Sequence, residues 1–456
     1  MGKWMAAVLA AGKGTQMKSR HPKVLHKVGG VPMVARVLAA SAKAGVTEAA
    51  VIVGFGAEEV REALGHRVSY VLQAEQLGTG HAVRLAQEAL AAAESVLVVC
   101  GDTPLLRAET LRQLVETHAA SGAAASILTT HLDDPTGYGR IVRDDADRVV
   151  RIVEEKDADT ATKAITEVNT GTYCFQAADL WEKLADIGCD NAQGEYYLTD
   201  VIGLLVADGR LVAGVVCEDD SETLGVNSRA QLAVAEGVAR QRKLAALMAA
   251  GVTVIDPQTT YVDESVTVGA DTVLEPGTIL RGTTTVGSDC VIGPDTELVD
   301  THVGDSAHIH RTYAHECRVG DGAEIGPYVH LRPGTELAEN VKVGNFVEVK
   351  NSAVGTGSKL PHLSYIGDTD MGAHVNIGCG TITVNYNGKI KQRTTVHDGA
   401  FIGCNSNLVA PVEIGREAYI GAGSTITKDV PARALAVGRA KQFVKEGWVT
   451  DDTYKE

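Results

Sequence analysis

The stretch VDESVTVGADTVLEPGTILRGTTTVGSDCVIGPDTEL, residues 262–298, carries an aliphatic residue at every sixth position. The residues at this spacing are Val262, Val268, Leu274, Leu280, Val286, Ile292 and Leu298. A period of six fits neither the turn of an α-helix, about 3.6 residues, nor the alternation of an ordinary strand. It fits a coil that turns a corner every six residues, with one aliphatic side chain per face pointing inward and three faces to each coil. The stretch therefore predicts a β-helix.

The same period continues through most of the second half of the chain. It resumes, after a slip in phase, at Val319, Ile325, Leu331, Leu337, Val343 and Val349, and again at Val396, Ile402, Leu408, Ile414, Ile420 and Ile426. Tight corners favour a residue without a side chain, and the glycines that follow an inward residue are Gly269, Gly287, Gly293, Gly320, Gly326, Gly344, Gly403, Gly415 and Gly421. The segment NYNGKIKQRT, residues 385–394, interrupts the period. Loops that project from a rigid scaffold often carry function, so this segment is a candidate site.

Composition limits the number of domains and the class of ligand. With 456 residues, the chain exceeds the size at which a single core stops growing, about 250 to 300 residues, so we expect two domains. The 58 acidic and 42 basic residues give a net charge of −16, which disfavours nucleic acid and anionic membrane as partners. The apolar run at the N-terminus is too short for a signal peptide or a membrane span. We therefore expect a cytoplasmic protein whose eight cysteines are free thiols.

The first half of the chain has a different pattern. Between residues 5 and 226, short apolar runs such as AAVIVGF and SVLVVCGD alternate with helical patterns. Such alternation is typical of βαβ units and of a mainly parallel sheet with helices on both faces. Apolar residues at helical spacing predict a connecting helix next. The expected parts are an α/β domain at 1–226, a linker helix at 227–250 and a β-helix domain at 251–456.

Two features of the α/β half indicate an ion-binding site. The first apolar run ends in LAAGKGTQM, residues 9–17, where glycines after a strand let backbone N–H groups face a phosphate and lysines supply charge. The run VLVVCGD places Asp102 at the carboxyl end of a strand, which is the edge at which open α/β sheets bind ligands. A carboxylate at that edge can hold a divalent cation. Taken alone, such a loop is more often a plain turn, and Asp102 can equally cap a helix.

Further strings decide between these alternatives. QAEQLGTGHA (73–82), DDPTGYGRIV (133–142), IVEEKDA, NTGTYCF, NAQGEYYLTD and GVNSR resemble the sugar-nucleotide pyrophosphorylases. Nearly end to end, the chain is similar to the family of bifunctional bacterial N-acetylglucosamine-1-phosphate uridylyltransferases/glucosamine-1-phosphate acetyltransferases. The resemblance implies a Rossmann-like α/β nucleotidyltransferase domain followed by a left-handed parallel β-helix. It also implies acetyl transfer from acetyl-CoA to glucosamine 1-phosphate, and then Mg²⁺-dependent uridylyl transfer from UTP to N-acetylglucosamine 1-phosphate with release of pyrophosphate.

The resemblance assigns roles to residues of the α/β half. Those that would bind the UTP phosphates and the uracil are Leu9, Ala10, Ala11, Gly12, Lys13, Gly14, Lys23, Gln73, Gly78 and Thr79. Gly139, Glu154 and Asn169 would contact the amino sugar, and Asp102 and Asn227 match the family's Mg²⁺ ligands. In-line attack of the sugar phosphate on the α-phosphorus of UTP needs positioning and charge neutralisation more than covalent catalysis.

One position departs from the family pattern. The family's loop usually reads GKGTRM, with an arginine facing the triphosphate, whereas this chain has Gln16. Loss of that planar cation would weaken charge neutralisation in the transition state, because lysine does not reproduce the bidentate contacts of arginine. Lys18 and Arg20 lie nearby in the sequence and are candidates for compensation.

The second half contains a candidate general base. His362, in KLPHLSYIGD, lies within the repeats but off their period. An imidazole that titrates near neutrality can take the proton of an amine as the amine attacks a thioester. A single histidine is more often a surface residue at a corner, but VGNFVEVKNS, HLSYIGD, NIGCGT and VNYNG all match one site of the acetyltransferase family. The resemblance implies that His362 is the general base, oriented by Glu348, and that Asn385 positions the substrate.

Further contacts on the β-helix follow from the same resemblance. The residues that match contacts to the amino-sugar phosphate or to coenzyme A are Arg332, Lys350, Tyr365, Asn376, Cys379, Asn385, Tyr386, Cys404, Ala422 and Arg439. Cys379 and Cys404 stand where related proteins often have Ala or Ser, and passive packing is the simpler explanation for them. A thiol-blocking reagent would inhibit acetyl transfer only if these thiols border the coenzyme site. The histidines between residues 302 and 330 follow the solenoid rather than the geometry of metal ligands, so we expect solvated faces there.

Three functions stay open at this point. The first is the bifunctional enzyme, the second a nucleotidyltransferase with a purely structural or regulatory β-helix, and the third a non-enzymatic interaction protein built from the same two folds. His362 and the 385–394 segment argue against the second, and Asp102, Asn227 and Lys23 argue against the third. Such β-helices generally form trimers with sites between neighbouring subunits, so we expect a homotrimer.

Overall fold

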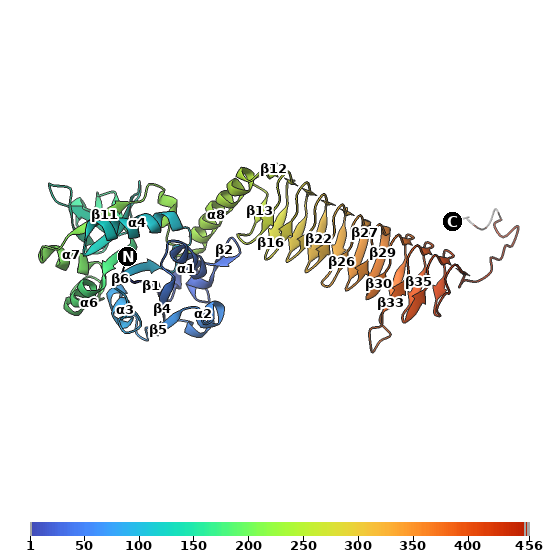
Figure 1. Ribbon diagram of the computed structural model, residues 1–456, viewed down its shortest axis with the longest axis horizontal. Coiled ribbons are helices and arrows are strands. Elements are labelled where there is room, and N and C mark those ends of the chain that lie inside the picture. The colour runs from blue at the N-terminus through green and yellow to red at the C-terminus, as the bar shows by residue number, and fades with distance from the viewer. Residues whose placement is uncertain (1, 451–452, 454–456) are drawn as a thin grey trace. The chain divides into compact units, whose positions relative to one another are not determined.

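The computed structural model describes residues 2–450 and residue 453. The chain divides into two units, Met1–Arg240 and Gln241–Glu456, each with its own hydrophobic core. Figure 1 shows an α/β arrangement in the first unit and stacked coils in the second. All eight cysteines are free, and no helix in the described part of the chain is long and apolar enough to cross a membrane.

The first unit is built on one mainly parallel sheet. In spatial order its strands are β11 (Val212–Val216), β7 (Ala125–His131), β10 (Glu167–Gln176), β6 (Ser95–Cys100), β1 (Trp4–Ala10), β4 (Glu48–Val53) and β5 (Ser69–Leu72). β1 pairs in parallel with β4 and β6, whereas β10 runs antiparallel to both of its neighbours. The hairpin of β8 (Arg140–Arg143) and β9 (Val149–Val153) extends from β10. The prediction of a mainly parallel sheet is confirmed.

Helices cover both faces of this sheet, because successive strand residues point to opposite sides. Val8 of β1 belongs to a core with α1 (Met33–Lys43), α2 (Ala57–Leu64) and α4 (Ala108–Ser121). Its neighbour Ala7 belongs to a second core with α3 (Thr79–Leu85), α6 (Ala177–Asp186) and α7 (Asp200–Ala207). The strands are therefore buried on both sides, which leaves their carboxyl ends and the loops beyond them to form a site.

The predicted connecting helix is α8 (Arg229–Ala249). In the first unit, Ala235 and Ala239 pack with Val28 in a small apolar cluster. In the second unit, Leu244 and Leu247 belong to the core of the β-helix. The two ends of one helix thus contribute to different cores.

The second unit is a left-handed parallel β-helix whose short strands run from β12 (Thr253–Val254) to β39 (Leu435–Ala436). Strands of consecutive coils pair in parallel and in register, as Val262 does with Leu280 and Leu280 with Leu298. All the predicted inward residues are at most 6% exposed except Val268, which is partly buried. The six-residue period therefore identified the core of this unit.

Coil length explains where the period slips. Val286 pairs with Val303, and Val303 pairs with Val319, so each of these coils is slightly shorter than the coils that precede it. Met371 pairs with Val396, and this coil is longer than the others because it carries the predicted insertion. Residues 385–394 form a hairpin, closed by an antiparallel bridge between Tyr386 and Lys391, that projects from the coils (Figure 1).

The glycines of the repeats are explained mainly by the space that a side chain would need. Of those expected to relieve tight corners, Gly293 and Gly326 alone have positive φ, 111° and 115°. At Gly269 a Cβ atom would lie 2.6 Å from the backbone of the following coil, and at Gly320 it would meet the same obstacle at 2.6 Å. Positive φ at the corners is adopted instead by residues such as Asp300. Close approach of successive coils, rather than backbone conformation, explains most of these glycines.

Candidate functional site

A cavity of about 260 Å³ lies at the carboxyl ends of the central strands of the first unit. The loop after β1, the start of α3 and the residues after β5 and β6 all line it. The predicted nucleotide residues found there are Leu9, Ala10, Ala11, Gly12, Lys23, Gln73, Gly78, Thr79 and Asp102. Residues that are far apart in the sequence therefore meet at one position, as the strand order requires.

The polar groups of this cavity are held in fixed orientations. The buried Gln73 donates from Nε2 to the carbonyl oxygen of Gly78 at 3.1 Å and contacts Nδ1 of His81 at 3.1 Å. Burial and the charge of Arg84 lower the pKa of His81, which favours a neutral ring whose Nδ1 accepts. The Oε1 atom of Gln73 is left to accept a hydrogen bond from a ligand. Gly78 has φ 105°, and a Cβ atom there would lie 2.5 Å from the carbonyl oxygen of Tyr196.

A second cavity of about 530 Å³ shares Lys23 with the first. Gly14, Gln16 and Asn227 line it, whereas the predicted Lys13 lines neither cavity. Lys18 and Arg20, the candidates to compensate for Gln16, are also absent from its lining; Arg20 donates instead to His21. Lys23 is the cation that both cavities share.

The predicted metal ligands lie together around that lysine. The Lys23 ammonium pairs with the Asp102 carboxylate and donates to Oδ1 of Asn227 at 2.7 Å. A carboxylate and an amide oxygen are hard ligands of the kind that Mg²⁺ prefers. Because a positive group already lies between these two oxygens, the position suits a cation, and the residues fit a Mg²⁺ site.

The three residues predicted to contact the sugar also lie together. The backbone N–H of Asn169 donates to the carbonyl oxygen of Gly139 at 2.9 Å, and a Cβ atom on Gly139 would come within 3.5 Å of the Glu154 carboxylate. Burial raises the pKa of Glu154, which accepts a hydrogen bond from the hydroxyl of Thr199 at 3.0 Å. A larger residue at position 139 would therefore reduce the space beside Glu154.

On the β-helix, His362 lies on one of the two longest strands. β27 (Lys342–Lys350) and β29 (Lys359–Gly367) pair in parallel and place Asn345 beside His362. Nδ1 of His362 is 3.0 Å from Oδ1 of Asn345, and Glu348 pairs with Arg332 at 2.8 Å. The hydrogen-bond partner of the histidine in this chain is therefore Asn345, whereas the predicted partner Glu348 is bound to an arginine.

The predicted coenzyme residues form a row that begins at His362. Lys359 pairs with Asn376, so His362 and Cys379 occupy matching positions on successive coils. Ile377 pairs with Ile402 and Ile402 with Ile420, which extends the row through Cys404 to Ala422. At the end of the row, Arg439 donates to the carbonyl oxygen of Ala422 at 2.7 Å. An extended ligand lying along this corner of the coils would contact each of these residues.

A polar cluster lies on the adjacent corner. Asn385 donates from Nδ2 to the hydroxyl of Tyr365 at 3.4 Å. The ammonium of Lys350 lowers the pKa of Lys391, a lysine on the hairpin beside it. Tyr386 is exposed on the same hairpin. Two adjacent cations suit a doubly charged phosphate group.

Comparison with known proteins gives a consistent picture for both units. Residues 5–221 match the nucleotidyl transferase family, and residues 316–351 and 393–428 match the bacterial transferase hexapeptide family. The Bifunctional protein GlmU of Heliobacterium modesticaldum is 54% identical over 98% of this chain and 98% of that protein. The protein of the same name from Geobacillus thermodenitrificans is 52% identical over 98% of both chains. That of Shouchella clausii is 50% identical over 98% of this chain and 99% of its own. The chain belongs to the GlmU family.

As a GlmU protein, the chain is a bifunctional enzyme, a nucleotidyltransferase and acetyltransferase of UDP-N-acetylglucosamine synthesis. The predicted family, fold and bifunctional activity are thereby confirmed, and the hypothesis of a purely structural β-helix is set aside.

Three residues that contact the proposed site residues were not singled out individually in the sequence. They are Asn345 beside His362, Lys391 beside Lys350 and Thr199 beside Glu154. Asn345 precedes His362 by one coil, and Lys391 lies opposite Tyr386 in the hairpin. Coil length and hairpin register would therefore have identified those two, whereas Thr199 meets Glu154 only through the tertiary fold.

Proposed function

We propose that each unit carries one of the two reactions, with uridylyl transfer in residues 1–226 and acetyl transfer in residues 251–456. Glucosamine 1-phosphate and acetyl-CoA would react first, on the β-helix, and the product would then react with UTP in the α/β unit. The observation that carries this division is that the predicted residues gather into two separate sets, one within each unit.

For uridylyl transfer, the bound groups follow from the donors and acceptors that the first unit offers. Oε1 of Gln73 would accept the N–H of the uracil ring, since Nε2 is already occupied. Backbone N–H groups of residues 9–14 and the Lys23 ammonium would hold the phosphates. Gly139, Glu154 and Asn169 would orient the sugar so that its phosphate oxygen lies in line with the α-phosphorus of UTP.

Asp102 and Asn227 would hold Mg²⁺ in this site. When bound, the ion would neutralise charge on the triphosphate and on the departing pyrophosphate. The Lys23 ammonium, which now bridges these two residues, would be free to turn toward a phosphate oxygen. Chelation of Mg²⁺ should therefore stop uridylyl transfer and leave acetyl transfer unchanged.

For acetyl transfer, His362 would act as the general base. Oδ1 of Asn345 only accepts, so Nδ1 of His362 carries the proton and Nε2 keeps its lone pair. Nε2 would take a proton from the amine of glucosamine 1-phosphate as the nitrogen attacks the thioester carbon. The C–S bond breaks, coenzyme A leaves as the thiol after protonation, and no acyl-enzyme is formed. Arg332, Lys350 and Tyr365 would bind the sugar phosphate.

We also propose that the protein acts as a homotrimer in the cytoplasm. Support for assembly comes from a row of large apolar side chains at one corner of the coils, Tyr328, Phe346 and Leu363, which are exposed in a single chain. Exposed apolar patches often mark protein–protein contacts, and most soluble oligomers are symmetric assemblies of identical chains.

The test is to assay acetyl transfer and pyrophosphate release separately in the full-length protein. Asp102→Ala should abolish pyrophosphate release and spare acetyl transfer, and His362→Ala should do the reverse. Loss of both activities in either variant, in a protein that melts as the wild type does, would contradict the division of the reactions between the units.

A further inference from the structure

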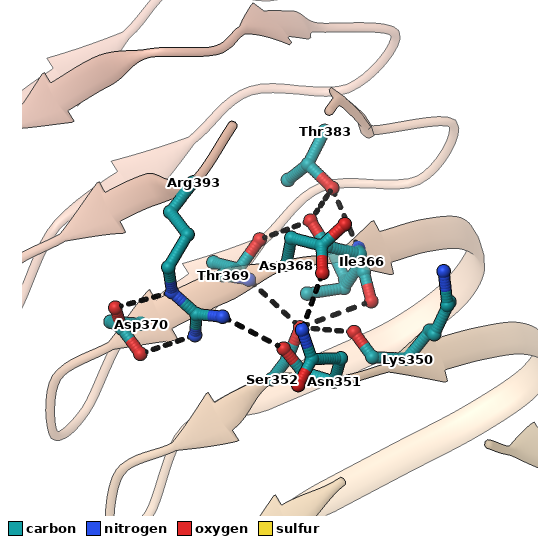
Figure 2. A network of polar contacts seen from close by, with 10 residues as sticks. Lys350, Asn351, Ser352, Ile366, Asp368, Thr369, Asp370, Thr383 and Arg393 are labelled. Atoms are coloured by element: carbon teal, nitrogen blue, oxygen red, sulfur yellow. Dashed lines mark hydrogen bonds and ion pairs between the residues drawn. The ribbon is translucent and has the colours of Figure 1, made fainter. Parts of the chain in front are cut away.

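Three polar residues occupy the same corner of three successive coils. They are Asn351, Asp368 and Asn385, and hydrogen bonds join each to the next. Figure 2 shows the Asp368 carboxylate pointing toward Asn351, within a network that also contains Lys350 and Arg393. Asp368 is thus in contact with the coil before it and with the first residue of the 385–394 hairpin.

Asp368 determines which way the Asn385 amide faces. Nδ2 of Asn385 donates to Oδ2 of Asp368 and to the hydroxyl of Tyr365. A carboxylate only accepts hydrogen bonds, so it selects the NH₂ side of the amide and turns Oδ1 away. Both N–H groups of the amide are then in use, and the side-chain group of Asn385 that stays available is an acceptor.

The carboxylate is itself held firmly. Asp368 is 5% exposed and has φ 48°, and its backbone N–H donates to the carbonyl oxygen of Lys350 at 3.0 Å. Nδ2 of Asn351 donates to its other oxygen, Oδ1. Burial raises the pKa of Asp368, but the two amide hydrogen bonds and the charge of Lys350 outweigh burial and keep the pKa below its usual value. The group therefore stays an acceptor near neutral pH.

We propose that Asp368 is a positioning residue for acetyl transfer, which holds the Asn385 amide so that Oδ1 faces the amine of the sugar. An acceptor at that position orients the amine lone pair toward the thioester while His362 takes the proton. Asp368 touches neither substrate, so its effect passes through Asn385. The inference rests on the proposed acetyltransferase site.

The first experiment compares Asp368→Asn with Asp300→Asn in the full-length protein. Asp300 has the same left-handed backbone, with φ 47°, and lies at a corner remote from the cluster. An asparagine at position 368 can present either its accepting oxygen or its donating NH₂ group to Asn385, so it no longer selects one orientation of the Asn385 amide. We expect kcat for acetyl transfer to fall by about tenfold to 100-fold in Asp368→Asn, the effect of one hydrogen bond to a charged group. KM for glucosamine 1-phosphate should stay within about twofold, and Asp300→Asn should match the wild type.

A double-mutant cycle separates positioning from a structural role. In an Asn385→Ala background, Asp368→Asn should have no further effect on kcat, because the amide through which it acts is gone. A general defect in the coils would instead lower kcat by the same factor in both backgrounds. Additive effects would therefore overturn the proposal.

An exchange of the two residues adds an independent measurement. Asn385→Asp alone places two carboxylates side by side and should be less active than the exchanged pair Asp368→Asn/Asn385→Asp, in which the new amide donates to the new carboxylate. Failure of the exchange to recover activity would count against the contact. If Asn385→Ala left acetyl transfer unchanged, the proposed acetyltransferase site would be wrong. If Asn385→Ala lowered acetyl transfer but Asp368→Asn did not, only the positioning role of Asp368 would be overturned.

Discussion

At the scale of single residues, the partner of each polar atom decides what the side chain can do. Asn345 fixes the proton on one nitrogen of His362, and His81 and Gly78 leave Gln73 a single acceptor. The residue types alone permit either tautomer and either amide orientation. The roles proposed for these residues therefore depend on contacts that become visible only in the folded chain.

Gln16 stands where the family resemblance of the sequence implies an arginine. It lines the larger cavity of the first unit, where Lys23 supplies the positive charge and neither Lys18 nor Arg20 contributes. We expect Gln16→Arg to raise kcat/KM of uridylyl transfer for UTP by about tenfold, because a guanidinium can bind phosphate oxygens in a bidentate manner. Acetyl transfer in the same protein serves as the control. No rise in the rate would show that another group already neutralises the triphosphate, and Lys18→Met and Arg20→Met would then identify it.

His118 makes the stability of the first unit depend on pH. It is fully buried between Ser126, 3.0 Å away, and the edge of Trp4, and burial lowers its pKa to about 4 from an ordinary 6.5. Between these values the unfolded chain binds a proton that the folded chain does not, so acid favours unfolding. The stability supplied by the neutral histidine is complete above pH 6.5 and should fall by roughly 2 kcal/mol at pH 5. In urea unfolding, the loss between pH 7 and pH 5 should be smaller in His118→Gln; an equal loss in both proteins would contradict this account.

At the scale of elements, the sequence pattern predicts which residues are buried but not how long each coil is. The six-residue period identified the core of the β-helix because one buried side chain per face is repeated in every coil. It did not give the coil lengths, since a shortened coil keeps its inward residues and changes only a corner. The contacts across coils depend on those lengths. A shortened coil brings Asn345 beside His362, and Asp368 meets Asn385 where the insertion of the following, longer coil begins. The sequence could therefore propose His362 and Asn385 for a site but could not give their hydrogen bonds.

The end of the β-helix needs a cap, because the first coil has no preceding coil to pair with. Lys243 of α8 donates to the carbonyl oxygens of Glu264 and Val266 at 2.8 and 2.7 Å, beside the apolar cap of Leu244 and Leu247. We expect Lys243→Met to reduce the free energy of unfolding of this unit by about 1–2 kcal/mol, since two carbonyls lose a charged donor while the aliphatic stem is kept. Lys428→Met, at an exposed position, is the matched control. Hydrogen exchange in the first coils should accelerate in the first variant and not in the second; equal protection in both would contradict a capping role.

At the scale of the whole molecule, the two proposed sites differ in how complete they are within one chain. Most of the residues proposed to bind the nucleotide line cavities formed by a single unit. The row from His362 to Arg439 instead lies along a corner of the coils, beside a row of exposed apolar side chains. A neighbouring subunit that covered this corner would close the acetyltransferase site and leave the other site unaffected.

The row of Tyr328, Phe346 and Leu363 gives the most direct test of this asymmetry. These side chains are 56–59% exposed, and the rings of Tyr328 and Phe346 stack 5.4 Å apart. In a trimer that buries this row, Tyr328→Glu places a carboxylate in an apolar interface, so we expect light scattering to report monomers. Acetyl transfer should fall at least about tenfold, whereas pyrophosphate release should stay at the wild-type rate.

The control is Val234→Glu, at an exposed apolar position on α8 in the first unit, which should change neither the mass of the assembly nor either activity. A Tyr328→Glu protein that remained trimeric would place the interface elsewhere, and a monomer with full acetyl transfer would show that one chain completes the site alone.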